Sequence, residues 1–314
     1  MNKNLTHWSN YWKDGNLTSL PQDFLENYDG EIEKFWNNTF SKVPVNGQVL
    51  DLCTGNGAIA LLAVAYSENN EANLKVTAVD AAKVKIANLS IKHAHLNDYF
   101  QKINLISDCR VEEIQLASNS FDIITSQYGI EYCDWELSAK QVARLLKPDG
   151  QLVFISHANS TDIMTYMIQE QNEYNAIKEA GLFTALARYF DKNSSYKEMN
   201  RALKKTQKVL IKIYQQNKSI LLKGLLDFLH YIVSVDKKVF LANENKVLSF
   251  YHQHLFAFAR LEDVIGVSLK IKHSPNWYLA FEKSGLKLED SGEVLQSGVH
   301  KAGIYYKFLK PSKT

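Results

Sequence analysis

A short apolar run that breaks at two glycines constrains the fold of this chain more than any other feature. Residues 49–60 read VLDLCTGNGAIA, which predicts a buried strand, a tight turn at Gly55 and Gly57, and a helix that begins directly afterwards. Such a turn lets a ligand approach the main chain, and the helix offers that ligand its free N–H groups. The segment therefore predicts a nucleotide-type binding site at the end of a buried strand.

The acid ahead of the glycines narrows the choice of ligand. Asp51 lies where a dinucleotide-binding fold would place a pyrophosphate, and its carboxylate would repel that anion. S-adenosylmethionine suits the position better, because it carries an amino group and a sulfonium but no phosphate. An acidic residue followed by Gly-x-Gly resembles the first motif of the class I S-adenosylmethionine-dependent methyltransferases.

Four more segments follow in the order that this family shows. Two are apolar runs that end at an acid, the third enters a strand through Ser-Phe-Asp, and the fourth has a Pro-Asp-Gly turn ahead of its strand. They are residues 74–80, 103–108, 119–132 and 145–155. The resemblance covers about residues 47–157. It implies an α/β, Rossmann-like methyltransferase fold, with a doubly wound, seven-stranded, mostly parallel sheet.

The resemblance also implies a cofactor, S-adenosylmethionine, with S-adenosylhomocysteine as the product and no metal ion. Asp80 would bind the ribose hydroxyls, although a similar acid serves nicotinamide enzymes and could instead cap a helix over residues 81–97. Asp108 and the amide of Cys109 would contact the adenine, and Gln127 the methionine end. The cofactor-binding residues implied are Asp51, Gly55, Asn56, Gly57, Asp80, Ala81, Asp108, Cys109, Gln127 and Tyr11.

Methyl transfer is an in-line displacement at an activated carbon, so the protein mainly has to align the acceptor and exclude water. An acceptor that must lose a proton also needs a base near the ends of the fourth and fifth strands. His157 follows the fifth strand, and Tyr128 and Glu131 follow the fourth. Many family members carry histidines where Glu131 and Tyr132 stand. We predict His157, Tyr128 and Glu131 as catalytic residues, although each could instead be structural.

The chain is longer than a minimal methyltransferase core, and the extra length lies after the fifth strand. About a hundred residues there contain three glycines and no proline, so we expect a large helical insert that covers the acceptor pocket. The predicted parts are an N-terminal helical cap, the cofactor-binding core, the insert or lid, and a C-terminal helix with the sixth and seventh strands. They span residues 1–46, 47–159, 160–273 and 274–314.

Basic residues gather at one place in the predicted insert. Their spacing of three, four or one puts them on one face of a helix over residues 197–212; they are Lys197, Arg201, Lys204, Lys205, Lys208 and Lys212. This face is either simply solvated or docks on an acidic partner. The net charge of +2 does not by itself indicate a nucleic-acid binder.

The remaining features suggest an ordinary protein of the cytoplasm. No apolar stretch is long enough to cross a bilayer, and no apolar signal region stands near the N-terminus, so we expect no membrane insertion. Cys53, Cys109 and Cys133 match no zinc spacing and are interpreted as reduced thiols. The sequence leaves the oligomeric state open.

These features favour a methyltransferase that acts on a small-molecule acceptor. One alternative is an RNA or protein methyltransferase that docks through helix 197–212, and another is a non-catalytic binding subunit that retains the fold. A nicotinamide oxidoreductase is disfavoured, because Asp51 would repel the phosphates of its cofactor.

Overall fold

The computed structural model describes residues 5–19, 24, 26–85, 89, 92–157, 161–296 and 300–312. The chain divides into two compact units. Residues 1–160 together with 267–314 form the first, called the core unit, and residues 161–266 form the second, called the helical unit.

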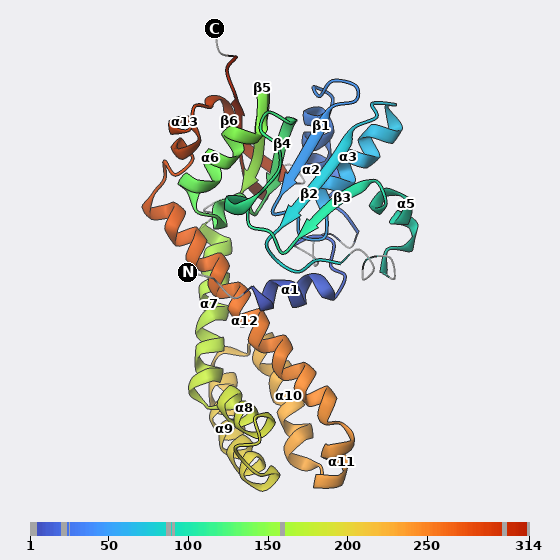
Figure 1. Cartoon of the computed structure of the whole chain (residues 1–314). Helices are drawn as coiled ribbons and strands as arrows, with labels where there is room; N and C mark the ends of the chain where they lie inside the picture. The colour runs from blue at the N-terminus through green and yellow to red at the C-terminus, as the bar shows by residue number, and fades with distance from the viewer. Residues whose placement is uncertain are drawn as a thin grey trace. The chain divides into compact units, whose positions relative to one another are not determined.

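A seven-stranded sheet runs through the core unit (Figure 1). Its strand order is β3-β2-β1-β4-β5-β7-β6. The first five strands along the chain are parallel, while β7 pairs antiparallel with both β5 and β6. The strands are β1 (Gln48–Leu52), β2 (Lys75–Asp80), β3 (Ile103–Ser107), β4 (Phe121–Gln127), β5 (Leu146–Ser156), β6 (Lys287–Gln296) and β7 (His300–Leu309). This topology confirms the predicted doubly wound, mostly parallel sheet.

Helices cover both faces of this sheet, with α2 and α3 on one side and α6 and α13 on the other (Figure 1). Successive strand residues point to opposite faces, so Val49 joins the apolar cluster beneath α2 and α3, and Leu50 joins the cluster beneath α6 and α13. The core-unit helices are α1 (Thr6–Lys13), α2 (Gly30–Phe40), α3 (Ala58–Asn69), α5 (Asn97–Phe100), α6 (Trp135–Leu145) and α13 (Leu279–Lys283), with 3₁₀ turns η1 (Ala94–Leu96), η2 (Val111–Glu113) and η3 (Ile130–Tyr132).

The structure corrects two of the predicted helices. Residues 81–85 are not helical, because the Asp80 carboxylate turns the chain by accepting the amide of Ala82 at 2.7 Å. Residues 86–88, 90 and 91 of that predicted helix lie outside the described residues. The helix predicted over 275–284 is shorter, since residues 275–278 form turns before α13 begins.

The helical unit confirms the prediction of a helical insert after the fifth strand. Its helices are α7 (Thr161–Glu179), α8 (Leu182–Phe190), α9 (Tyr196–Asn217), α10 (Ile220–Ser234), α11 (Lys237–Ala242) and the larger part of α12 (Glu244–His273). Helix α9 begins with a capping box between Ser195 and Glu198, and it buries Met199, Leu203 and Leu210 in the unit's apolar core. None of the helices in the described ranges is both long enough and apolar enough to span a membrane.

Strand β7 passes so close to β5 that one of its residues has to be glycine. A Cβ atom on Gly303 would lie 2.6 Å from Ile155 Cγ2 and 2.6 Å from the carbonyl oxygen of Ser156. We expect Gly303→Ala to lower the free energy of unfolding by about 1–3 kcal/mol, since the buried pair of strands would have to move apart. Urea denaturation followed by circular dichroism measures this.

Gly224→Ala in α10 is the matched control, because a Cβ atom there meets nothing within 4 Å. Alanine is the better helix former, so this variant should be as stable as the parent or slightly more stable. Equal stability of Gly303→Ala and the parent would show that β7 does not need glycine at this contact.

Candidate functional site

The predicted site residues gather where the strand order of the sheet reverses. Strands β1 and β4 are neighbours at this point, and the chain leaves them in opposite directions to reach β2 and β5. Ligands of open α/β sheets bind in the crevice outside the carboxyl ends of the strands at such a switch point. The loops that follow β1, β2, β4 and β5 all lie at this edge.

Asp51, one residue before the end of β1, is a buried acid with only 1% of its surface exposed. Its two carboxylate oxygens accept the hydroxyls of Thr54 at 2.5 Å and Thr125 at 2.9 Å. Burial raises the pKa of Asp51 to about 7, although both hydroxyls oppose the rise. A cation placed beside this carboxyl would favour its ionised form, as expected for the positively charged ligand inferred from the sequence.

Asp80, at the end of β2, holds the glycine turn that follows β1. One carboxylate oxygen accepts the Gly55 amide at 2.7 Å and the other accepts the Ala82 amide at 2.7 Å. Burial raises the pKa of Asp80 to about 6, and the two amides oppose the rise. An ionised carboxylate offers about four acceptor positions, so Asp80 keeps acceptor capacity for ligand hydroxyls.

Helix α1 is tied to the same turn. Gly55 has φ +54° and lies so close to the Trp12 ring that a Cβ atom would be 2.5 Å from it. The side-chain amide of Asn56 donates to the carbonyls of Trp12 and Asn16, at 2.8 and 2.6 Å. Gly57, at φ +85°, precedes α3. Tyr11, which the sequence predicted as a cofactor contact, also lies in α1, and its hydroxyl donates to the Thr18 carbonyl at 2.8 Å.

The helical spacing of Trp8, Tyr11 and Trp12 predicted packing over the ligand, and of these Tyr11 was predicted as the cofactor contact; it is Trp12 that contacts the glycine turn. The helical spacing of the aromatic residues near the N-terminus was the available signal, but spacing alone does not tell which ring meets the turn. Thr54 and Thr125 were also missed, since a lone threonine beside an acid has no distinctive pattern.

The predicted adenine contacts lie at the ends of β2 and β3. Ala81 is half-buried directly after Asp80, and Asp108 is exposed with an ion pair of 3.8 Å to Lys83. The Cys109 amide donates to the Asp80 carbonyl at 2.9 Å. That amide is therefore engaged inside the protein, and the Asp108 carboxylate is the better placed of the two for a ligand.

Two buried polar atoms at this edge have no partner among the described residues. They are Gln127 Nε2, a donor, and Asn56 Oδ1, an acceptor. Gln127 is fixed by the Trp36 indole, which donates to its Oε1 at 2.6 Å. Buried polar groups in native proteins are nearly always paired, so these atoms suit a ligand that offers both an acceptor and a donor. The carboxylate and ammonium of an amino acid fit that description.

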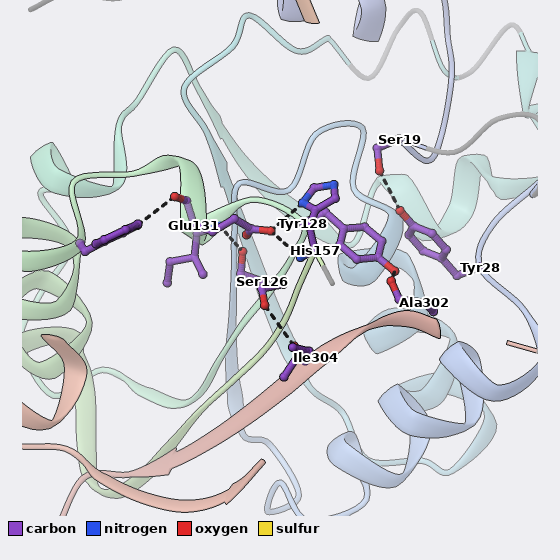
Figure 2. Close-up of polar contacts among 11 residues, drawn as sticks. Ser19, Tyr28, Ser126, Tyr128, Glu131, His157, Ala302 and Ile304 are labelled. Carbon is purple, nitrogen blue, oxygen red and sulfur yellow. Dashed lines mark hydrogen bonds and ion pairs between the residues drawn. The ribbon is translucent and has the colours of Figure 1, made fainter. Parts of the chain in front are cut away.

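Glu131 and His157 form a hydrogen-bonded pair after β4 and β5 (Figure 2). Glu131 is fully buried, and its Oε1 accepts the His157 amide at 2.9 Å and its Nδ1–H at 2.8 Å. With Nδ1 as the donor, the neutral imidazole presents Nε2 as a proton acceptor. Glu131 Oε2 has no partner among the described residues.

Tyr128 packs its ring beside the imidazole of His157, with centroids 4.8 Å apart. Its hydroxyl points to β7 and donates to the Ala302 carbonyl at 2.7 Å (Figure 2). Burial raises the pKa of Tyr128 above its usual range. The geometry therefore suits Tyr128 as a wall beside His157 and not as a proton carrier.

The part of the chain that the structure describes contains no group of three or more His, Cys, Asp or Glu side chains placed to hold a metal ion.

Comparison with known proteins relates the central segment to one family. Residues 50–154 match the family model described as a methyltransferase domain. The ubiquinone/menaquinone biosynthesis C-methyltransferase UbiE of Rickettsia felis is 28% identical over 151 residues, which are 45% of this chain and 60% of that relative. UbiE of Geotalea daltonii is 31% identical over 116 residues, or 36% of this chain and 47% of the relative. The chain thus spans less than two thirds of either relative.

Among solved structures, the YcgJ protein of Bacillus subtilis matches 45% of this chain and 57% of its own, at 23% identity and a TM-score of 0.35. The strand order, and not this loose likeness, defines the fold of the core unit.

The buried Asp51 carboxyl should make the stability of the unliganded protein fall as the pH rises. The unfolded chain releases this proton near pH 4, whereas the folded chain holds it to about pH 7, so the folded state binds more protons between these values. The stabilising contribution is complete below about pH 4 and is lost as the pH rises through about 7. The side chain of the Asp51→Asn variant cannot ionise, so the variant should not lose this stability as the pH rises.

The measurement is urea unfolding of the parent and Asp51→Asn from about pH 4 to about pH 8. The stability advantage of the variant should grow across this range by up to about 4 kcal/mol, which corresponds to about three pKa units. Parallel curves for the two proteins would contradict the assignment of a buried, proton-binding Asp51.

Proposed function

We propose that this chain, whose residues 50–154 form a class I S-adenosylmethionine-dependent methyltransferase domain, transfers a methyl group to a small-molecule acceptor that loses a proton. The observation that carries the proposal is the Glu131–His157 pair at the same sheet edge as Asp51 and Asp80. A cofactor site and a positioned base thereby meet at the switch point.

The residues of the crevice fit the proposed cofactor. Asp80 keeps acceptor capacity for the ribose hydroxyls, and Asp108 offers an exposed carboxylate for the adenine amino group. Gln127 Nε2 and Asn56 Oδ1 suit the carboxylate and ammonium of the methionine end. When bound, S-adenosylmethionine supplies a methyl group that is already activated for displacement.

Proton removal is the task that we assign to His157. Glu131 Oε1 holds Nδ1–H, so the ring is fixed in the tautomer that leaves Nε2 free to take a proton from the acceptor. The buried carboxylate also stabilises the imidazolium that results, as the acid does in a Ser-His-Asp triad. Tyr128 limits the sideways movement of the ring.

The acceptor class follows from this base together with the names of the relatives. Two relatives are named for C-methylation in ubiquinone and menaquinone biosynthesis. A carbon becomes a good nucleophile when a hydroxyl on the same aromatic ring gives up its proton, which is the step that His157 can serve. We therefore extend the proposal to C-methylation of a hydroxylated aromatic ring.

A second candidate, methylation of RNA or protein, is favoured by one surface of the helical unit. Five basic side chains of α9, together with Asn200, line an open groove of about 390 Å³; they are Lys197, Arg201, Lys204, Lys205 and Lys208. An acidic macromolecule could dock there. The apolar side of α9 is packed within the core of the helical unit, which favours electrostatic docking over insertion into a membrane.

One experiment separates the two candidates. The purified protein is incubated with methyl-labelled S-adenosylmethionine and a cell extract, and small molecules, RNA and protein are then separated and counted. Label in small molecules supports the first candidate. Label in RNA or protein that is lost on replacing Lys204, Lys205 and Lys208 with glutamate supports the second. Absence of label from every fraction contradicts both.

Removing the base should slow the chemical step and leave cofactor binding unchanged. We expect His157→Gln to lower kcat by about 10²–10⁴-fold, the range typical for general-base catalysis, and to abolish the part of the pH–rate profile that reports the base. Steady-state kinetics across pH and calorimetric titration of S-adenosylmethionine measure the two effects.

His273→Gln is the matched control, since His273 is exposed and its ring contacts the Leu269 carbonyl within its own helix. Glu131→Gln should also lower kcat, because an amide cannot stabilise the imidazolium as a carboxylate does. Full turnover of His157→Gln at every pH would remove this residue from the mechanism.

A further inference from the structure

Two cysteines that are far apart in the sequence meet at the switch point of the sheet. Cys53 follows β1 and Cys133 follows η3, and the neighbouring positions of β1 and β4 bring their sulfur atoms to 3.7 Å. Both side chains are half-buried. The third cysteine, Cys109, instead has its sulfur 3.6 Å from the Arg110 carbonyl.

The main chain around this pair is arranged to bring the two thiols together. Cys53 has φ +55°, a left-handed conformation that costs a non-glycine residue about 1 kcal/mol or more. Gly129 passes directly over it, and a Cβ atom there would lie 2.2 Å from the Cys53 Cβ. The loop after β4 can therefore approach Cys53 only because residue 129 is glycine.

From these contacts we infer that Cys53 and Cys133 are a reversible oxidation site, which hydrogen peroxide or a similar small peroxide converts to a disulfide. A disulfide has its sulfur atoms about 2.05 Å apart, so the pair must close by roughly 1.7 Å from its present distance. A peroxide is small enough to reach half-buried thiols. The closure requires the turn after β1 and the turn after η3 to move toward one another.

The chemistry balances with peroxide as the oxidant. The Cys133 thiolate attacks one peroxide oxygen, the O–O bond breaks, and the products are a Cys133 sulfenic acid and hydroxide. The Cys53 thiol then displaces the sulfenic hydroxyl, and after proton transfer a disulfide and water remain. Two thiols thus lose two electrons and two protons, and one hydrogen peroxide becomes two waters.

The surroundings of the pair assign the first attack to Cys133. The hydrogen bond with Cys133, burial and the carboxylates of Asp80 and Glu131 raise the pKa of the Cys53 thiol. Cys53 is thereby kept protonated and is a poor first nucleophile. It is well suited to the second step, in which the sulfenic sulfur is already beside it.

A disulfide here would join the turn proposed to bind the cofactor to the segment that carries Glu131. Cys53 stands between Asp51 and Gly55, and Cys133 lies two residues after Glu131. Drawing these loops together would displace the glycine turn from the position that the Asp80 carboxylate holds at 2.7 Å. We therefore expect oxidation to weaken cofactor binding, a consequence that rests on the proposed function, whereas disulfide formation itself does not.

The test of the bond itself is made on the full-length protein, treated with hydrogen peroxide, blocked with a thiol-alkylating reagent and digested. Mass spectrometry should show a peptide pair joined between Cys53 and Cys133 that dithiothreitol releases, with Cys109 alkylated. Cys109→Ser should still form the bond, and Cys133→Ser and Cys133→Ala should not. Alkylation of both Cys53 and Cys133 after treatment, or their irreversible oxidation to sulfinic acids, would overturn the proposal.

The functional consequence is measured by calorimetric titration of reduced, oxidised and re-reduced protein with S-adenosylmethionine. Oxidation should raise Kd at least tenfold and dithiothreitol should restore it, while Kd of Cys133→Ser should not respond to peroxide. A disulfide without an effect on Kd would overturn the regulatory role. Failure of the reduced protein to bind would instead contradict the proposed function and leave the mass-spectrometric result standing.

Discussion

The hydrogen bond between the Asp80 carboxylate and the Gly55 amide is the contact on which the site depends. It joins the acid that ends β2 to the turn that follows β1, so two neighbouring parallel strands share one rigid edge. The same edge carries a second buried acid, Asp51, which is held by two threonine hydroxyls. Burial raises the pKa of both acids. A ligand that brings a positive charge or hydroxyl donors to this edge would lower these pKa values and favour the ionised carboxylates.

The second constraint is the reversal of strand order between β1 and β4. It brings the glycine turn close to the loop that carries Glu131, and it places β5, which His157 follows, next to β4. The loops to which we assign cofactor binding and proton removal, and the loops that carry the cysteine pair, are therefore adjoining. Any change that moves one of these loops acts on the others, because the packing between them leaves no room at Gly129.

The sequence predicted the strands in their order along the chain and the helical nature of the insert. Central strands such as β1 and β4 are buried on both faces and appear as short apolar runs. It was less successful where tertiary contacts decide local structure. Residues 81–85 are not helical, since Asp80 turns the chain, and the spacing of the N-terminal aromatic residues did not indicate that Trp12 is the ring against Gly55. The approach of Cys53 to Cys133 also depends on strand order in space, which spacing along the chain does not reveal.

Helix α1 contains no buried residue, so its own packing gives it little stability. Its contacts with the rest of the core unit include the Trp12 ring against Gly55, the Trp12 carbonyl that accepts the Asn56 side-chain amide, and the Ser9 hydroxyl that accepts the Lys83 amide. The local unfolding free energy of α1 consequently depends in part on the glycine turn. Hydrogen exchange in α1 should therefore respond to an event that reshapes that turn, so this helix reports on the state of the glycine turn.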